Sequence, residues 1–265
     1  MKKKLKKTRI IFFLPVFSLG GASESIIKLS KFLINHNYSI SLISIGKNVH
    51  KKYLKKIGCD VCEINTNRAL FSILALRRLI KKDLKKKFFQ TILISNIHYA
   101  NIISLISCVK LKNVKIVLTE RSSLSELSIY TGFFNFLKKR IIFFLAKYFY
   151  RFANLIITNS KFEKKFINKY FFVNKVKCIY PASILKVKNN FKMSQKSDNL
   201  KKIIYVGRLS REKDVITILK ALVIIKDKLN FKLEIYGDGE EKENIKKFIK
   251  SNNLDNKILL NGFNK

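Results

Sequence analysis

The chain has 265 residues, of which 48% are hydrophobic and 27% are charged; this is a globular composition and excludes an intrinsically disordered chain. Its 55 lysines and arginines outnumber 17 acidic residues, which gives a formal net charge of +38. Only nine of the basic residues are arginine, and the abundance of Lys, Ile, Asn and Phe is the bias that an AT-rich genome imposes. Because the lysines are spread over all predicted helices and form no single stripe, we expect no nucleic-acid partner.

The basic residues favour a different partner, an anionic membrane surface. Three clusters, at 2–7, 81–87 and 138–140, each place several positive charges close together. Such a charge is worth ~1 kcal/mol near acidic lipid. No run of 18 or more apolar residues occurs, so we expect attachment to the surface and no membrane-spanning helix.

The N-terminus has two interpretations. Basic residues up to Arg9, the apolar run 10–14 and the sequence L-G-G-A at 19–22 resemble a signal peptide with its cleavage site. Alternatively, 10–14 is the first parallel strand of a sheet, buried on both faces and followed by a Gly-Gly turn. We favour the strand, and with it a cytoplasmic protein. Four cysteines without a clear disulfide framework suit that reducing compartment.

Strands and helices alternate along the whole chain, beginning with a strand, a helix and a strand within residues 10–45. Further strands are predicted at 58–64, 91–95, 114–119, 155–158 and 176–180, and helices at 101–109, 133–152 and 161–170. A second set follows, with strands at 203–206, 233–239 and near 258 and a helix at 215–228. This alternation predicts an α/β fold with two Rossmann-like, doubly wound domains.

The domain boundaries follow from a polar, aperiodic stretch. Residues 186–202 read as a linker, so the domains are predicted at 1–185 and 203–265. Two such domains would place a ligand cleft between them, at the carboxyl ends of both sheets.

The start of the second domain combines a strand, a glycine and a basic loop. Gly207 ends the strand and allows close backbone approach, and Arg208 and Lys213 precede the predicted helix at 215. Two cations at a helix start form a binding site for a diphosphate. The alternative is that these side chains, together with Arg211, only decorate an exposed helix start.

Several motifs in order resemble one family. The sequence V-G-R-L-S-x-x-K from 206, L-x-I-x-G-x-G-E from 233 and I-x-L-x-G-F from 258 resemble the donor-binding domain of the retaining GT-B glycosyltransferases, group 1, family 4. The turn G-G-A at 20–22, T-E-R at 119–121 and A-N-L-I-I-T-N-S at 153–160 resemble the N-terminal domain of its bacterial members. Tyr180 stands where the family usually has Asn before the proline.

The resemblance implies roles for particular residues. Arg208 and Lys213 match the pair that holds the donor diphosphate, which needs no metal or other cofactor. Arg121 stands where many relatives carry a His that contacts the transferred sugar, and because arginine cannot act as a base near neutral pH its role would be binding. Glu120 would orient Arg121 or contact acceptor hydroxyls, and His98 follows a strand end where it could face the cleft.

Two further features depend on the same resemblance. Gly20 and Gly21 would let the first loop approach the sugar or its phosphate, or they form an ordinary tight turn. The segment 133–152 interleaves aromatic and basic residues. It is either an amphipathic helix that docks on the membrane beside lipid-linked acceptors or a core helix whose lysine tips reach outward.

The predicted activity is transfer of a sugar from a nucleotide diphosphate donor to a glycan or lipid-linked acceptor in bacterial surface polysaccharide or oligosaccharide biosynthesis. The alternative is an inactive remnant that binds at most a nucleotide or a membrane. We expect the second domain to be incomplete, because the family's E-x7-E motif does not follow Phe263. The chain alone should then be inactive unless a second fragment completes the domain.

Overall fold

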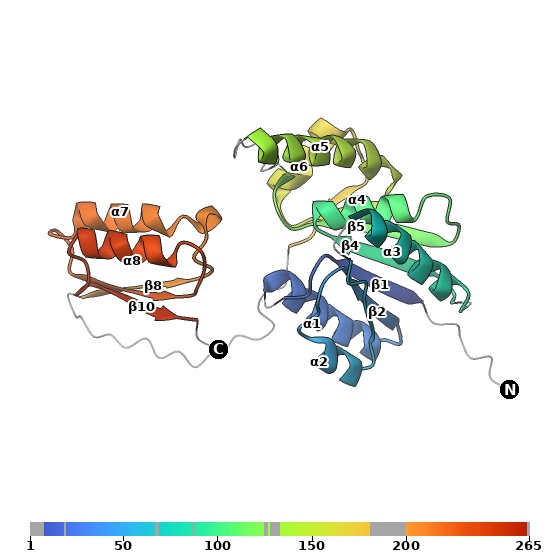
Figure 1. Ribbon diagram of the computed structural model, residues 1–265, viewed down its shortest axis with the longest axis horizontal. Coiled ribbons are helices and arrows are strands. Elements are labelled where there is room, and N and C mark those ends of the chain that lie inside the picture. The colour runs from blue at the N-terminus through green and yellow to red at the C-terminus, as the bar shows by residue number, and fades with distance from the viewer. Residues whose placement is uncertain are drawn as a thin grey trace. The chain divides into compact units, whose positions relative to one another are not determined.

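The computed structural model describes residues 8–18, 20–66, 69–86, 88–124, 127, 133–180 and 200–263. Contacts divide the chain into two compact units, Met1–Val187 and Lys188–Lys265. The predicted linker lies outside the described residues up to position 199, and so does the lysine cluster 2–7. Each unit is an α/β layer structure with a parallel sheet (Figure 1).

The first unit is built on a seven-stranded parallel sheet with the order β3-β2-β1-β4-β5-β6-β7. Its strands are β1 (Arg9–Leu14), β2 (Ser39–Ser44), β3 (Asp60–Glu63), β4 (Thr91–Asn96), β5 (Val114–Glu120), β6 (Leu155–Thr158) and β7 (Val176–Cys178). The order reverses between β1 and β4, which is the doubly wound arrangement expected from the sequence.

Strand β1 lies at the centre of this sheet. It pairs with β2 on one side and with β4 on the other, and all six of its residues are buried. Phe12 pairs with Leu42 and with Ile94. A strand buried on both faces is continuously apolar, which is why it resembled the core of a signal peptide. The signal-peptide interpretation of this segment is therefore wrong.

Helices cover both faces of the sheet. They are α1 (Gly21–Asn35), α2 (Lys51–Lys56), α3 (Ala69–Leu84), α4 (His98–Ser107), α5 (Phe133–Phe149) and α6 (Lys161–Phe171), with a short 3-10 turn at Tyr150–Phe152. Alternate residues of β1 enter different cores: Phe12 packs with α1 and α2, and Phe13 packs with α3 and α4. Helix α3 was not predicted from the sequence, although Leu76 and Ile80, one helical turn apart, are both fully buried.

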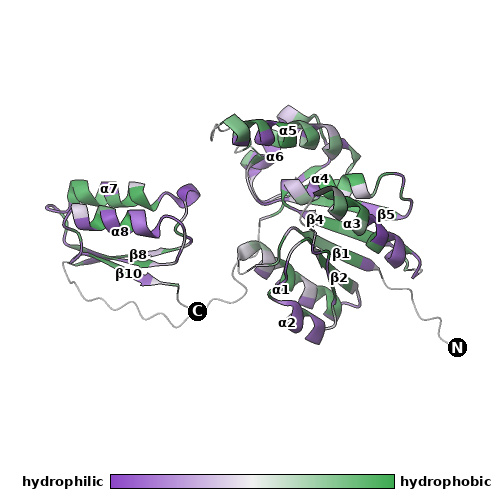
Figure 2. Ribbon diagram, viewed as in Figure 1, coloured by the Kyte–Doolittle hydropathy of each residue, from purple (hydrophilic) through white to green (hydrophobic). Residues whose placement is uncertain are grey.

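The second unit has a three-stranded parallel sheet with the order β10-β9-β8. Its elements are β8 (Lys201–Val206), a 3-10 turn (Arg211–Lys213), α7 (Val215–Ile225), β9 (Phe231–Tyr236), α8 (Lys242–Ser251) and β10 (Ile258–Gly262). Helix α7 is almost entirely hydrophobic, whereas α8 is amphipathic (Figure 2). Both pack against buried side chains of β9, namely Phe231, Leu233 and Ile235.

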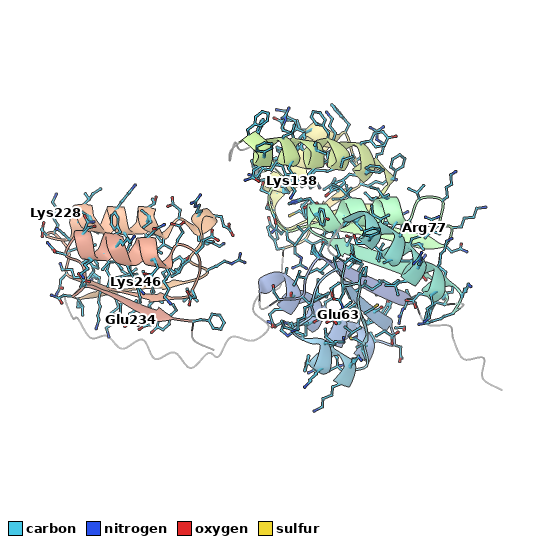
Figure 3. The ribbon with its side chains drawn as sticks, viewed as in Figure 1. Glu63, Arg77, Lys138, Lys228, Glu234 and Lys246 are labelled. Carbon is cyan, nitrogen blue, oxygen red and sulfur yellow. The ribbon has the colours of Figure 1, made fainter. Side chains whose placement is uncertain are left out.

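Helices α7 and α8 lie on one face of this sheet, and Glu234 points from the other (Figure 3). In β8 the residues of that second face are exposed, with Ile204 at 64% and Val206 at 77%. Phe263, just after β10, is 64% exposed. Within residues 200–263, therefore, the sheet is covered by helices on one face only.

Candidate functional site

The central strands of the first sheet end at a common edge, where the strand order reverses. In open α/β sheets ligands bind in the crevice at this point, outside the carboxyl ends of the strands. Gly20 and Gly21 follow β1, His98 follows β4, and Arg121 follows β5. The structure thus brings these four residues, predicted from separate motifs, to one edge of one sheet.

Arg121 lies across the ends of these strands. Its Nε donates to Asn96 Oδ1 at 3.2 Å, and its Nη1 donates to the hydroxyl of Ser25 on α1 at 2.5 Å. Its carbonyl accepts from Asn159 Nδ2 at 3.1 Å. Burial lowers the pKa of Arg121 from its usual value, but arginine stays charged at any physiological pH. The guanidinium is therefore a half-buried cation held in one orientation.

Asn96 and Ser25 are site residues that the sequence did not reveal. Asn96 ends β4 and is 1% exposed, and its Oδ1 also accepts from Thr119 Oγ1 at 2.5 Å. Neither residue belongs to a recognisable motif. The signal that could have found Asn96 is its position, because a polar residue at the end of an apolar central strand lies at the ligand edge.

Glu120 does not have the predicted role. Its side chain is 1% exposed and turns into the core, where Oε1 accepts from Asn101 Nδ2 at 2.7 Å and from the hydroxyl of Tyr150. Burial raises the pKa of Glu120 to about 8, so the carboxyl is mostly protonated at neutral pH. The structure shows no bond to Arg121 and no access for an acceptor, because β5 alternates and consecutive side chains point to opposite sides.

The loop before α4 is strained. Ile97 has a φ of +76°, which is a genuine outlier for a β-branched residue. Its N–H donates to the carbonyl of Thr119 at 3.0 Å. Backbone strain of this kind costs ~1–3 kcal/mol and clusters at ligand sites. His98 follows directly and is half-buried; its Nδ1 has no partner among the described residues.

Burial also lowers the pKa of His98, so its imidazole is neutral at physiological pH. A neutral ring can accept or donate a hydrogen bond. Its contact with a substrate remains a prediction.

Gly20 and Gly21 face open space. A Cβ at either position would have no protein atom within 4 Å, and Gly20 has an extended backbone with φ of 179°. No positive φ is found at Gly21. The turn itself therefore does not require glycine at these positions.

In the second unit, glycines position the loop that carries the predicted cations. A Cβ on Gly237 would lie 1.8 Å from the carbonyl oxygen of Gly207, and a Cβ on Gly239 would lie 2.3 Å from that of Leu209. The N–H of Leu209 donates to the carbonyl of Asp238 at 3.0 Å. The glycines of the G-D-G motif thus let the loop after β9 lie directly against the loop after β8.

The cations on this loop are exposed. Arg208 is 70% exposed at its side chain and lies 3.7 Å from Glu212, a weak surface pair. Lys213 is exposed and has no side-chain partner within the described part of the chain. Arg211, whose side chain is 86% exposed, pairs with Glu241 at 3.2 Å. Two of the three cations are therefore available to a ligand.

Helix α7 begins at Val215, as predicted, but an acidic side chain caps its N-terminus. The cations precede α7 on a loop and a 3-10 turn, and Asp214 is the N-cap, with φ of +44°. Its carboxylate accepts from the hydroxyl of Thr217 at 2.7 Å and from the N–H of that residue at 3.4 Å. Because an acidic side chain already caps the helix, a diphosphate here would depend on Arg208 and Lys213 and not on the free N–H groups of α7.

Two kinds of feature are absent from the described residues. No group of three or more His, Cys, Asp and Glu side chains that could hold a metal ion occurs among them. In the same part of the chain, no helix is both long enough and apolar enough to cross a membrane.

Comparison with known proteins relates both units to glycosyltransferases. Residues 19–182 match the family described as Glycosyltransferase Family 4, and residues 186–265 match Glycosyl transferases group 1. An uncharacterised glycosyltransferase of Haemophilus influenzae is 27% identical over 93% of this chain and 66% of its own length.

Two further matches are more specific. The N-acetylgalactosamine-N,N'-diacetylbacillosaminyl-diphospho-undecaprenol 4-alpha-N-acetylgalactosaminyltransferase of Campylobacter jejuni is 25% identical over 94% of this chain and 68% of its own length. The crystal structure of Anabaena HepE in complex with UDP and glucose aligns with a TM-score of 0.66 at 18% identity, over 96% of this chain and 69% of that one.

The extent of these matches decides what they show. The chain spans between 34% and 68% of the length of the curated relatives that it matches. The structural likeness confirms the predicted GT-B-like α/β fold. Since the first family match covers more than half of the chain and agrees with the motifs, this protein belongs to Glycosyltransferase Family 4.

Proposed function

We propose that this protein takes part in sugar transfer from a nucleoside diphosphate donor to a glycan or lipid-linked acceptor, with retention, in bacterial surface polysaccharide or oligosaccharide biosynthesis. The observation that carries the proposal is the loop after β8, with its two available cations Arg208 and Lys213. Two relatives support it: one is named for an acceptor on diphospho-undecaprenol, and another was solved with UDP and glucose.

Arg208 and Lys213 bind the donor diphosphate in this proposal. Breaking the glycosidic bond leaves negative charge on the diphosphate, and two nearby cations stabilise that charge without a metal ion or another cofactor. Gly207 keeps the backbone beside them free of a side chain. In the first unit, Gly20 and Gly21 leave room for the sugar or its phosphate, because no protein atom fills the space beside them.

Titration of UDP into the full chain tests the donor site. Lys213→Ala and Arg208→Gln should each weaken binding by roughly ten- to a hundredfold, the cost of one charge-assisted contact. Arg211→Ala is the matched control, because Arg211 lies on the same loop but pairs with Glu241. Equal UDP affinity in wild type and Lys213→Ala would refute the assignment.

The uncovered face of the second sheet indicates that the activity requires a partner polypeptide. Ile204, Val206 and Phe263 are exposed on or beside a face that no helix covers within residues 200–263. Apolar residues on an uncovered sheet face favour association with another polypeptide. We infer that a second polypeptide packs on this face and that turnover requires it; without that partner the chain binds at most a nucleotide or a membrane.

An assay of sugar transfer and donor hydrolysis tests this inference. It compares the purified chain alone with the chain mixed with a polypeptide encoded next to it. We expect turnover only in the mixture. Robust turnover by the chain alone would contradict the need for a second fragment, whereas loss of UDP binding in Lys213→Ala would still support the donor site.

Helix α5 supports membrane attachment. Only Ala146 of its 17 residues is buried, and Phe133, Phe134 and Phe144 are exposed by 57% to 84%. Arg140 lies over the ring of Phe144 at 5.3 Å. One face of the helix packs on the core through Ala146, Ile142 and Phe143. We propose that the exposed aromatic and basic side chains of the other face bind the cytoplasmic face of a membrane as a peripheral surface.

Sedimentation with lipid vesicles tests the membrane proposal. Binding should increase with anionic lipid and weaken with salt, because screening acts over only ~8 Å at physiological ionic strength. The exposed pair Phe134→Ala and Phe144→Ala should weaken binding, whereas Phe71→Ala, an exposed aromatic on α3, serves as the control. Binding that ignores both lipid charge and the α5 substitutions would contradict the proposal.

A further inference from the structure

An arginine lies at each end of the first sheet, Arg9 at the amino end and Arg121 at the carboxyl end, and the two differ in the charge of their partners. At the amino end Arg9 is 2% exposed, and its guanidinium pairs with two carboxylates. Nη2 lies 2.6 Å from Asp60 Oδ2, and Nε lies 2.8 Å from Asp83 Oδ2. A buried charge that is paired and hydrogen-bonded in this way has a structural role and needs nothing from outside.

At the carboxyl end Arg121 has only neutral partners. Its guanidinium bonds to the side-chain oxygens of Asn96 and Ser25, and no carboxylate pairs with it among the described residues. The nearest acid in sequence, Glu120, turns into the core and bonds to Tyr150. The fold thus directs the neighbouring carboxyl away from the guanidinium.

In another half-buried arginine of this unit, a helix end compensates the charge in place of a carboxylate. Arg77, labelled in Figure 3, also lacks a carboxylate, but its Nη1 donates to the carbonyls of Ser107 and Val109 at 2.8 Å each. These carbonyls lie at the C-terminal end of α4, where the helix dipole is negative. Arg121 lies at the opposite end of that helix, beside its first turn, where the dipole offers no such compensation.

Arg121 also keeps unused donors. A guanidinium has five N–H groups, and within the described residues two are used by Asn96 and Ser25, which leaves three. Because both bonds fix the guanidinium without neutralising it, the remaining donors form a rigid fork of the kind that binds phosphate oxygens in pairs.

We propose that Arg121 binds a diphosphate carried by the acceptor, at a site on the first unit distinct from the donor loop at Arg208 and Lys213. Ser25 and Asn96 are positioning residues for this guanidinium. The inference rests on the proposed function, which requires a donor and an acceptor. The acceptor is accordingly a lipid-linked glycan with the diphosphate at its lipid end, and an acceptor without that group binds poorly.

The experiment uses the full chain and the double variant Arg208→Gln/Lys213→Ala, which removes the candidate donor site. The probes are geranyl diphosphate, which has a lipid-linked diphosphate but no nucleoside, and UDP. Geranyl diphosphate should still bind the double variant, and adding Arg121→Gln should weaken that binding tenfold or more. Arg77→Gln is the matched arginine control and should leave the affinity unchanged.

Two further measurements keep the proposal testable if Arg121→Gln does not fold: the affinity of Arg121→Lys and a spectroscopic signal from Arg121 in the wild-type chain. Lysine keeps the charge but not the fork, so its affinity for geranyl diphosphate should fall between wild type and Arg121→Gln. In wild type, the Nε–H resonance of Arg121 in a nitrogen-15 spectrum should move on addition of geranyl diphosphate. Ser25→Ala should weaken binding by less than Arg121→Gln.

The outcomes separate this inference from the donor site. An unmoved Arg121 resonance, or equal geranyl diphosphate affinity in Arg121→Gln and wild type, would overturn it even if Lys213→Ala loses UDP. Weaker UDP binding by Arg121→Gln with unchanged geranyl diphosphate binding would also overturn it, by assigning Arg121 to the donor. Failure of Lys213→Ala to affect UDP would refute the donor site and leave the geranyl diphosphate result interpretable.

Discussion

The two candidate binding regions hold their cations in opposite ways. On the first unit, Arg121 is half-buried and fixed through side-chain hydrogen bonds to Asn96 and Ser25. On the second unit, Arg208 is 70% exposed and Lys213 has no side-chain partner in the described part of that unit, while the backbone of their loop is fixed by close contact with Gly237. One region orients the charge itself, and the other orients only the loop that carries it.

Because of this difference, different kinds of substitution should disturb the two regions. In the first unit a side-chain substitution disturbs the site, because the orientation of the guanidinium depends on named hydrogen-bond partners. In the second unit, substitution of an exposed cation should leave the fold intact. The conformation of the loop depends instead on Gly237 and Gly239, which allow close backbone contact. Four changes test the contrast, from the largest expected effect to the smallest.

Gly239→Ala should have the largest effect. Its Cβ would lie 2.3 Å from the carbonyl oxygen of Leu209 and 2.7 Å from its carbonyl carbon, so the loop after β8 must move. Forced overpacking of this kind should lower the free energy of unfolding by ~2–4 kcal/mol. Denaturant titration of the full chain measures it. Gly20→Ala is the control and should change stability by less than ~0.5 kcal/mol, because its Cβ enters open space.

Glu120→Gln should change the pH dependence of stability. The pKa of Glu120 in the folded state, about 8, lies above its usual value of 4.5. The folded state therefore binds the proton more tightly, and this group's contribution is present below pH 4.5 and is lost as pH rises toward 8. Glutamine can keep the bonds to Asn101 and Tyr150 without ionising. The variant should match wild type below pH 4.5 and exceed it by ~2–3 kcal/mol by about pH 6.5, where the unfolded carboxyl is ionised and the folded one is not.

Thermal unfolding of both proteins at several pH values measures this effect. Tyr150→Phe serves as the contrast, because it removes one of the two partners of the carboxyl and leaves the titrating group in place. Parallel pH profiles for Glu120→Gln and wild type would show that the carboxyl is not the buried, proton-retaining group described above.

Asp214→Ala should destabilise α7 moderately. The substitution removes the N-cap bonds to Thr217 and keeps a side chain at φ +44°. We expect a loss of ~1–2 kcal/mol. Asp214→Gly should cost less, a few tenths of a kcal/mol, because glycine adopts this backbone freely and is a tolerated cap. Equal losses for the two variants would show that neither the cap nor the backbone angle matters here.

Arg211→Ala should have the smallest effect. Its ion pair with Glu241 is exposed on the arginine side by 86%, so removal should cost less than ~1 kcal/mol and should not change UDP affinity. Denaturant titration and UDP titration check both values. A large loss of UDP binding here would move the donor site along the loop and weaken the distinction between paired and available cations.

Much of the fold was predictable from local patterns. Continuous apolar runs such as β1, together with glycines at their ends, indicated parallel strands, and the predicted strands of the first sheet occur in the structure within a few residues. Helix α3 was missed because its lysine-rich surface hides a narrow apolar stripe around Leu76 and Ile80. The motif glycine Gly207 and the basic residues after it lie on a single loop, as their sequence spacing implied.

By itself the sequence determined the alternation of elements, the family and the short segments that carry Arg121, Arg208 and Lys213, because each depends on residues close together in the chain. Only the tertiary structure decided which of those side chains reach the carboxyl edge. Arg121 bonds to Ser25, 96 positions earlier, while its neighbour Glu120 turns into the core. Such contacts depend on strand order and on the side to which each strand residue points, and no local pattern encodes a partner that far away.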